Sequence, residues 1–186
     1  MLKLPRTLRL DPSDTFVFEH AAEPGEWAVP GSFLFWDVDL ETMPPKRRAA
    51  FRAGFLGLSS FGFSTLVVVS EARADEREAA VALLSRHLTE RFGAPDEAAA
   101  RAAAEEEIAF ATSLCHHPEG TVLALHRSVE EGAVRERFRT LQRREPAAGG
   151  ADRLHAQARA FEFVEVEDEP EERVDLAGLI EGEGRR

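Results

Sequence analysis

The hydrophobic pattern of the first forty residues predicts short strands. Thr15–His20 (TFVFEH) places an aromatic side chain at every second position, the period-two pattern of a half-buried strand. Trp27–Val29 and Ser32–Asp39 have a similar character, and Pro30-Gly31 between them favours a bend or a bulge. We therefore expect an antiparallel hairpin or meander at the front of the chain.

The longest uncharged run is Gly54–Ser70 (GFLGLSSFGFSTLVVVS), which has 17 residues. A membrane-spanning helix needs about 20 apolar residues, and the glycines and serines within this run favour a turn. We expect two buried strands joined by a tight connection. A short helix near Pro44–Ala53 is expected before them, because prolines are tolerated in the first turn of a helix.

The middle of the chain has the periodicity of helices. Val81, Leu84 and Leu88 fall on one face of a helix that ends at Gly93. A second helix, rich in alanine, is expected from Pro95-Asp96 to about Cys115. Because the connection between the two is short, they should form a helical hairpin.

The last third of the chain is expected to mix strand and helix. Thr121–Arg127 and Ala160–Glu167 are predicted as strands, and Gly132–Arg143 as a basic helix. Strands at the front, helices behind them and a late returning strand do not give the regular alternation of a parallel sheet. The predicted class is therefore α+β, with a mostly antiparallel sheet packed on one side by helices.

Charge divides the chain into a domain and a tail. Of 186 residues, 23 are Lys or Arg and 34 are Asp or Glu, which gives a net charge of −11. Residues 145–186 contain five cations and twelve anions, so they carry −7 of that charge. We expect one α+β domain over residues 1–167, with a flexible linker within 145–153, and an acidic tail over residues 168–186.

The composition also limits the compartment and the partners. One cysteine, Cys115, excludes an intrachain disulfide and fits a reducing cytoplasm. The N-terminus has no secretory apolar region. Nucleic-acid binding requires clustered cations, so the acidic balance argues against it. The sequence predicts a cytoplasmic protein that binds neither nucleic acid nor membrane.

Motifs of familiar chemistry are incomplete. The run from Gly57 to Ser64 is spaced like a phosphate-binding loop, but Phe63 stands where that loop requires lysine. Ser59 lacks the closing glycine of a nucleophile elbow. No catalytic residue and no cofactor are predicted, and the question of enzymatic activity stays open, with a non-enzyme favoured.

The adjacent residues Cys115, His116 and His117 are a candidate metal site, because cysteine and histidine are good ligands for zinc or copper. The structural alternative is that Cys115 continues the apolar stripe of its helix. In that case the two histidines would only complement the negative end of the helix dipole.

A second set of residues is a candidate ligand site. An α+β sheet curved over helices can enclose an apolar pocket. Phe35 and Trp36 could line it, and Asp37, Asp39 and His126 could supply its polar groups. The structural alternative is a strand that leaves the core for solvent at its two aspartates.

Basic residues form the third candidate site. Arg135, Arg137, Arg139 and Arg143 could bind an acidic partner, and so could the group formed by Lys46, Arg47, Arg48 and Arg52. The structural alternative is that these cations pair with the acidic segments of the same chain.

Three segments carry a resemblance to a known family: LPRTLRLDPSDTFVFE (residues 4–19), GFLGLSSFGFSTLV (residues 54–67) and RERFRTL (residues 135–141). They resemble a family of uncharacterised proteobacterial proteins over roughly residues 2–180. The resemblance implies a small stand-alone cytoplasmic protein with no assigned activity, and it supplies no catalytic residues.

These observations lead to three hypotheses of function. The first is a non-catalytic interaction or accessory protein that binds a protein partner or itself, also through the apolar tail residues Leu176, Leu179 and Ile180. The second is a small-molecule-binding protein or enzyme with a pocket between sheet and helices. The third is a metal-binding protein that uses Cys115, His116 and His117.

Overall fold

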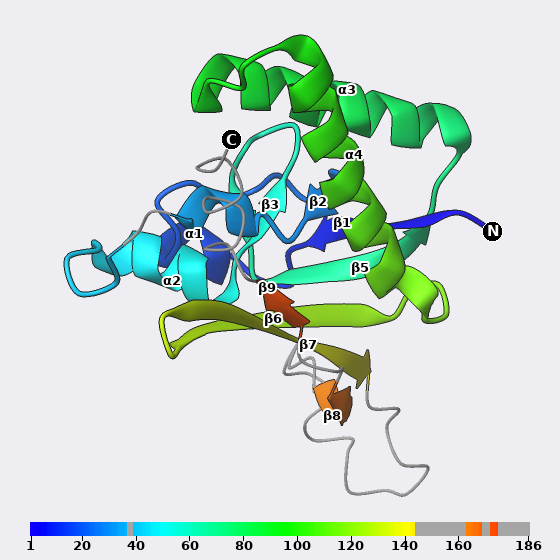
Figure 1. Cartoon of the computed structure of the whole chain (residues 1–186). Coiled ribbons are helices and arrows are strands. Elements are labelled where there is room, and N and C mark those ends of the chain that lie inside the picture. The colour runs from blue at the N-terminus through cyan, green and yellow to red at the C-terminus, as the bar shows by residue number, and fades with distance from the viewer. Residues whose placement is uncertain (37–38, 144–162, 169–171, 175–186) are drawn as a thin grey trace, which may run out of the picture.

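An antiparallel sheet runs through the molecule, and a pair of long helices covers one of its faces (Figure 1). The structure is a computed structural model that describes residues 1–36, 39–143, 163–168 and 172–174. The strand order is β1-β5-β6-β7-β8, and β9 pairs with β7 as well. The strands are β1 (Lys3–Leu8), β5 (Leu66–Glu71), β6 (Val122–Glu130), β7 (Ala133–Arg143), β8 (Phe163–Asp168) and β9 (Glu172–Val174). A second antiparallel sheet contains β2 (Ala28–Val29), β3 (Phe55–Gly57) and β4 (Phe63–Ser64).

The two long helices form the predicted hairpin. α3 (Ala74–Phe92) ends at Gly93, whose φ of 64° is the left-handed conformation that glycine adopts readily. α4 (Glu97–Ser113) begins at Asp96, whose carboxylate accepts the amide of Ala99 at 2.7 Å. Their apolar faces form one core with strands of both sheets, so the α+β prediction is confirmed. No helix in the described part of the chain combines the length and apolar character needed to cross a membrane.

Other predicted elements are also present. The uncharged run folds as two short strands, β3 and β4, followed by β5. The short helix α2 (Pro45–Ala53) has proline in its first turn, and the late strand β8 returns to the sheet beside β7. The predicted linker (145–153) and the apolar tail residues (176–180) lie outside the described residues.

The predicted strand Thr15–His20 is wrong, because this segment contains the short helix α1 (Ser13–Val17). The Asp11 carboxylate accepts the amide of Ser13 at 2.8 Å, which starts a turn before the alternating residues begin. Phe18 is buried, whereas Phe16 is 74% exposed. The alternation of aromatic residues in this segment therefore does not mark the buried face of a strand.

The predicted strand Ser32–Asp39 is also wrong. Residues Ser32–Phe35 form the 3₁₀ helix η1, and residues 37–38 lie outside the described part. Gly31 precedes η1 with φ of 74°, where a Cβ would lie 2.8 Å from the Cβ of Leu56. The predicted bend at Pro30-Gly31 is therefore present, but it turns the chain into a helical turn rather than joining two strands. β2 pairs with β3 and not with a neighbour in an N-terminal hairpin.

The predicted basic helix Gly132–Arg143 is in fact the strand β7, paired with β6 through a two-residue turn. Glu131 and Gly132 have φ of 54° and 81°, the pair of positive angles that a tight hairpin requires. Along β7, Glu136, Phe138 and Thr140 are buried, while the arginines between them lie on the other face. Burial along β7 therefore has a period of two residues, as expected for a strand with one face in the core.

A buried ion pair joins this hairpin to the rest of the fold. Arg127 of β6 lies opposite Glu136 of β7, and both side chains are completely buried. The Arg127 Nε donates to Glu136 Oε1 at 2.6 Å, and its Nη1 donates to the carbonyls of Phe51 and Gly54 at 3.1 and 3.0 Å. Its Nη2 donates to the carbonyl of Pro30. The guanidinium therefore ties β6 and β7 to both ends of the segment between β2 and β3.

The segment that carries η1 is held at three consecutive residues. The Pro30 carbonyl accepts from Arg127, the Gly31 amide donates to Glu107 Oε1 of α4 at 2.8 Å, and the Ser32 hydroxyl donates to Glu136. Burial lowers the pKa of Arg127, and the Glu136 carboxylate opposes this shift. Because its charge is met by a carboxylate and three carbonyls, Arg127 is accommodated in the interior.

We expect Glu136→Gln to lower the free energy of unfolding by about 3–5 kcal/mol, because it leaves the Arg127 charge buried without a counter-ion. Urea unfolding followed by circular dichroism measures the change. The matched control is Glu130→Gln on the outer face of the same hairpin, where a partly exposed ion pair contributes at most about 1 kcal/mol.

The double variant Arg127→Met/Glu136→Leu tests the role of the carbonyl contacts. Replacing a buried ion pair by apolar residues is often neutral, but here the carbonyls of Pro30, Phe51 and Gly54 lose their donor. We expect the double variant to remain destabilised, and recovery of wild-type stability would show that these contacts contribute little.

Candidate functional site

The residues of the predicted ligand site point in different directions. Phe35 is buried and packs edge-on against Phe51, with ring centroids 5.5 Å apart. His126 is exposed on the opposite side of the sheet, in register with Arg137. Trp36 is 59% exposed, and Asp39 is exposed in a turn where its carboxylate accepts the amide of Glu41. Asp37 lies outside the described residues. The described members therefore do not gather into one site.

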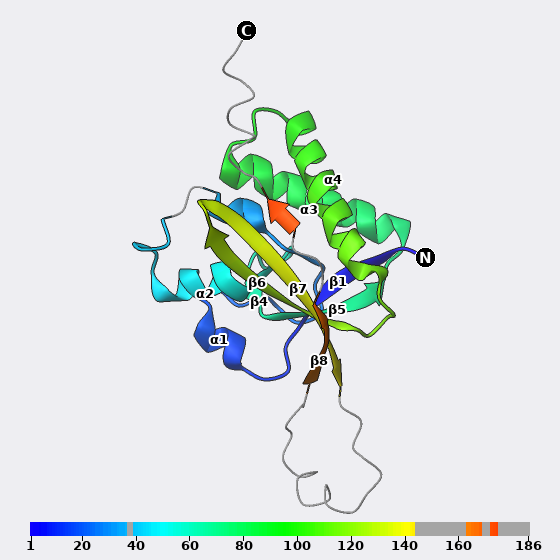
Figure 2. The same ribbon diagram turned by 60° about the horizontal axis from the view of Figure 1, so that its bottom comes forward.

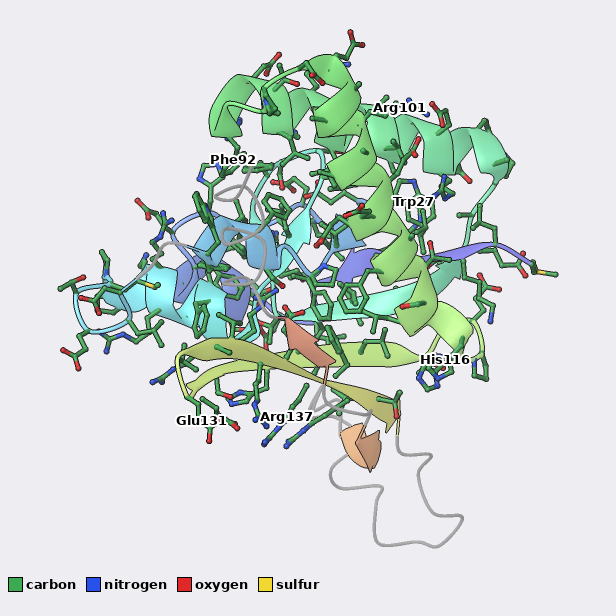
Figure 3. All side chains as sticks on the ribbon, viewed as in Figure 1. Trp27, Phe92, Arg101, His116, Glu131 and Arg137 are labelled. Carbon is green, nitrogen blue, oxygen red and sulfur yellow. The ribbon has the colours of Figure 1, made fainter. Side chains whose placement is uncertain are left out.

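The predicted metal residues are divided between core and surface. Cys115 is 3% exposed and packs with Leu123, Leu125 and Phe138, whereas His116 is exposed at the end of α4 (Figure 3). Burial raises the pKa of the Cys115 thiol to about 12, and the charge of Lys3 opposes this rise. Within the described ranges, no three His, Cys, Asp or Glu side chains are grouped to hold a metal ion. The metal hypothesis is therefore not carried further.

The glycine-rich turn is closed by a carboxylate of the same chain. Glu26 accepts the backbone amides of Ser59 and Ser60 at 2.5 and 2.8 Å, and also the hydroxyl of Ser60. A phosphate loop would offer such amides to a phosphate, but here Glu26 already occupies them. The assignment of Ser59 and Ser60 as turn residues fits these contacts.

The arginines of β7 lie on the face of the sheet away from α3 and α4, where Arg137 is seen in Figure 3. Arg135 pairs with Glu130 at 3.2 Å, and Arg137 pairs with the other oxygen of the same carboxylate at 3.5 Å. Arg139 also has an interaction partner. Nothing is described of the Arg143 side chain. The structural alternative, pairing within the chain, therefore applies at least to Arg135 and Arg137.

Helix α2, which lies beside α1, carries a different group of cations. Lys46, Arg47 and Arg52 of α2 are exposed, and within the described part of the chain no salt bridge involves them. α1 packs beside α2 (Figures 1 and 2), and it presents Phe16 and Val17 to solvent at 74% and 43% exposure. We call these five residues the α1–α2 corner.

The corner lies over a buried apolar cluster. Phe18, Met43, Ala50 and Phe51 form a buried cluster together with Phe35 beneath the two helices. α2 buries Ala50 and Phe51 in this cluster, whereas α1 buries only Asp14 and is followed by buried Phe18.

Hydrogen bonds fix the positions of both helices. Asp14 of α1 accepts the hydroxyl of Thr65 at 2.5 Å and its amide at 3.2 Å. Arg48 of α2 donates to the Met43 carbonyl at 3.1 Å, so this cation braces the preceding loop. Because the base is fixed, binding at the corner would require little ordering of the backbone.

Sequence reasoning singled out the cations of α2 but missed the apolar half of the corner. Phe16 was assigned to the buried face of a strand together with Phe18. The Asp-Pro-Ser-Asp segment before it (residues 11–14) is a helix-start signal and could have corrected that assignment.

The comparisons with known proteins identify a family for this chain but assign no activity to it. The fold defines an α+β protein whose exposed corner combines apolar and basic side chains. The chain belongs to DUF6505, a family of unknown function whose model matches residues 1–158. No curated protein and no solved structure is significantly similar to it.

The burial of Cys115 predicts slow thiol chemistry. A rise in the pKa from 9.0 to about 12 lowers the thiolate fraction at pH 8 roughly 1,000-fold. We expect the folded chain to react with a disulfide reagent at pH 8 at least about 100-fold more slowly than the chain in guanidinium. Ser113→Cys in a Cys115→Ala background supplies an exposed control two residues away, which should react fast.

The same pKa shift predicts a pH dependence of stability. Because the folded-state pKa of Cys115 lies above the unfolded value, the free energy of unfolding should fall as the pH rises from about 9 to 12. Cys115→Ala should remove this part of the dependence. An identical alkaline profile in both proteins would contradict the assignment.

Proposed function

We propose that this protein is a non-catalytic interaction factor that binds a protein partner through the α1–α2 corner. The observations that carry the proposal are exposed Phe16 on α1 and, on the neighbouring helix α2, three exposed cations, Lys46, Arg47 and Arg52, that form no ion pair among the described residues. Aromatic and arginine side chains are the residue types that concentrate binding energy at protein interfaces.

The apolar residues supply the affinity in this proposal. Burying a phenylalanine side chain contributes about 1.5–3 kcal/mol, and Val17 extends the same patch. A solvent-exposed phenylalanine contributes nothing comparable to the stability of the isolated chain. Its exposure on a base held by Asp14 and Phe18 therefore supports a role in binding.

The cations define the chemistry of the partner. Exposed Lys46, Arg47 and Arg52 attract a segment that carries Asp or Glu next to apolar residues. A membrane or a nucleic acid would also offer negative charge, but either presents an extended surface to a chain with a net charge of −11. A protein segment engages the corner alone and avoids most of that repulsion.

The reactive groups of the described core support a non-catalytic role. Arg127 and Glu136 are enclosed and bonded to one another, and burial keeps the Cys115 thiol protonated at neutral pH. These groups are occupied in holding the fold.

A photo-crosslinking experiment tests the proposal. A photoreactive amino acid replaces Phe16 in the full chain, produced in its native cells, and mass spectrometry identifies the products. We expect a crosslink to a defined protein whose attached peptide is acidic. Crosslinks to lipid or nucleic acid alone, or none, would contradict the proposal.

Two variants then test the chemistry with the identified partner. Phe16→Ser should weaken binding about 10-fold or more, and Arg47→Glu should weaken it several-fold, most strongly at low salt. The matched control is Arg86→Glu, which reverses an exposed arginine on α3 that has no ion pair among the described residues. Equal effects of Arg47→Glu and Arg86→Glu would show that the corner is not the binding surface.

A further inference from the structure

The end of α3 carries a group of aromatic side chains. Phe92 is the last residue of this helix and is 42% exposed (Figure 3). Its ring meets Phe33 of η1 edge-on, with ring centroids 5.6 Å apart, and the ring of Phe61 at 6.0 Å. Phe33 and Phe61 are partly buried. These three rings, which we call the α3 platform, bring together segments that are distant in the sequence.

Phe61 has a backbone conformation that aromatic residues rarely adopt. Its φ of 57° lies in the left-handed region. The ring lies against His87, with ring centroids 4.5 Å apart, and His87 is buried and donates from Nε2 to the Leu58 carbonyl at 3.0 Å. A bulky residue in the left-handed region persists only where its surroundings hold it there. The contacts of Phe61 therefore give its ring a defined position in the platform.

Arg91 adds a positive charge to the platform. It is exposed, and its Cζ lies 4.5 Å from the centroid of the Phe61 ring. A guanidinium that lies over a ring uses its flat face for that contact, so the N–H groups at its edge stay available to an acceptor. Among the described residues, these N–H groups have no hydrogen-bond or ion-pair partner. The edge of a guanidinium matches the two oxygens of a carboxylate.

Neighbouring carboxylates limit the number of negative charges that the platform can accept. Exposed Glu90 precedes Arg91, and exposed Asp96 and Glu97 follow at the start of α4. These groups repel a segment that carries several acidic residues, whereas a single carboxylate can pair with Arg91. The C-terminal residue of a polypeptide supplies one carboxylate and one side chain together, which is what the cation and the rings require.

We propose that the α3 platform and Arg91 bind the C-terminal residue of a protein partner that ends in an aromatic or large aliphatic side chain. The Arg91 N–H groups donate to the terminal carboxylate, and the terminal side chain packs against the rings of Phe61 and Phe92. The platform shares no residue with the α1–α2 corner, so binding at one surface does not depend on binding at the other.

Two peptides that differ in one group test this proposal. Both have the sequence acetyl-Gly-Ser-Gly-Ser-Phe, and one ends in a free carboxylate whereas the other ends in an amide. Each is titrated to millimolar concentration into the isotope-labelled full chain, and NMR follows the backbone amides. We expect the free acid to shift the amides of Phe61, Arg91 and Phe92 and to bind about 3–5-fold more tightly than the amide, the effect of one well-oriented exposed ion pair. Equal affinities, or no shifts at these residues, would overturn the proposal.

Variants of Arg91 and Phe92 separate the two halves of the site. Arg91→Gln should abolish the preference for the free acid and leave binding of the amide unchanged, and Arg91→Lys should keep part of the preference because a point charge remains. Phe92→Ser should weaken binding of both peptides about 3-fold or more. The matched control is Arg86→Gln, at an exposed arginine of the same helix. An equal loss of preference in Arg86→Gln and Arg91→Gln would overturn the assignment of Arg91.

A third peptide separates a chain terminus from an internal acidic residue. The amidated peptide acetyl-Gly-Ser-Gly-Asp-Phe carries its carboxylate one residue before the aromatic side chain. We expect it to bind no more tightly than the amidated peptide without aspartate. Binding as tight as that of the free acid would show that an internal acidic residue suffices, which would overturn the assignment to a C-terminus without bearing on the α1–α2 corner.

Discussion

Arg127 places a charged side chain with five N–H donors in the interior, and the surrounding chain supplies acceptors for four of them. Glu136 meets the charge, and the carbonyls of Pro30, Phe51 and Gly54 accept three further hydrogen bonds. These groups come from four places in the sequence. A misplaced element would leave a buried charge or carbonyl unbonded, at a cost of several kcal/mol. The pair therefore specifies how the β6–β7 hairpin packs on the N-terminal half.

This constraint also determines where the surfaces with binding chemistry lie. The Phe35 ring lies 5.5 Å from Cζ of the buried guanidinium, and the cluster that Phe35 forms with Phe51 lies under α1 and α2. The exposed halves of these two helices then meet at one corner. On the other side of the molecule, Glu136 points into the core. Because side chains alternate along a strand, its neighbours Arg135 and Arg137 point outward and pair with Glu130. The positions of the α1–α2 corner and of the arginine face of β7 thus follow from one packing arrangement.

Sequence reasoning succeeded where a local signal agreed with burial. The hairpin of α3 and α4 follows from a helical stripe, Gly93 and Asp96, all within about forty residues. It failed at Thr15–His20, Ser32–Asp39 and Gly132–Arg143. In each of these segments the residue pattern is compatible with both a strand and a helix. In β7 the row of arginines resembled a helix surface, although Glu131-Gly132 before it was a hairpin signal. At the candidate site, the cations of α2 were predicted but exposed Phe16 was not.

The sequence by itself determined the α+β class, the helical hairpin, the short strands of the uncharged run and the basic character of α2. Each depends on residues close together in the chain, whose periodicity and caps act locally. Only the tertiary structure decided that Arg127 and Glu136 are buried together, that Cys115 faces the core and that Phe16 faces solvent. These properties depend on contacts between distant segments, such as Arg127 with Pro30, which no local pattern encodes.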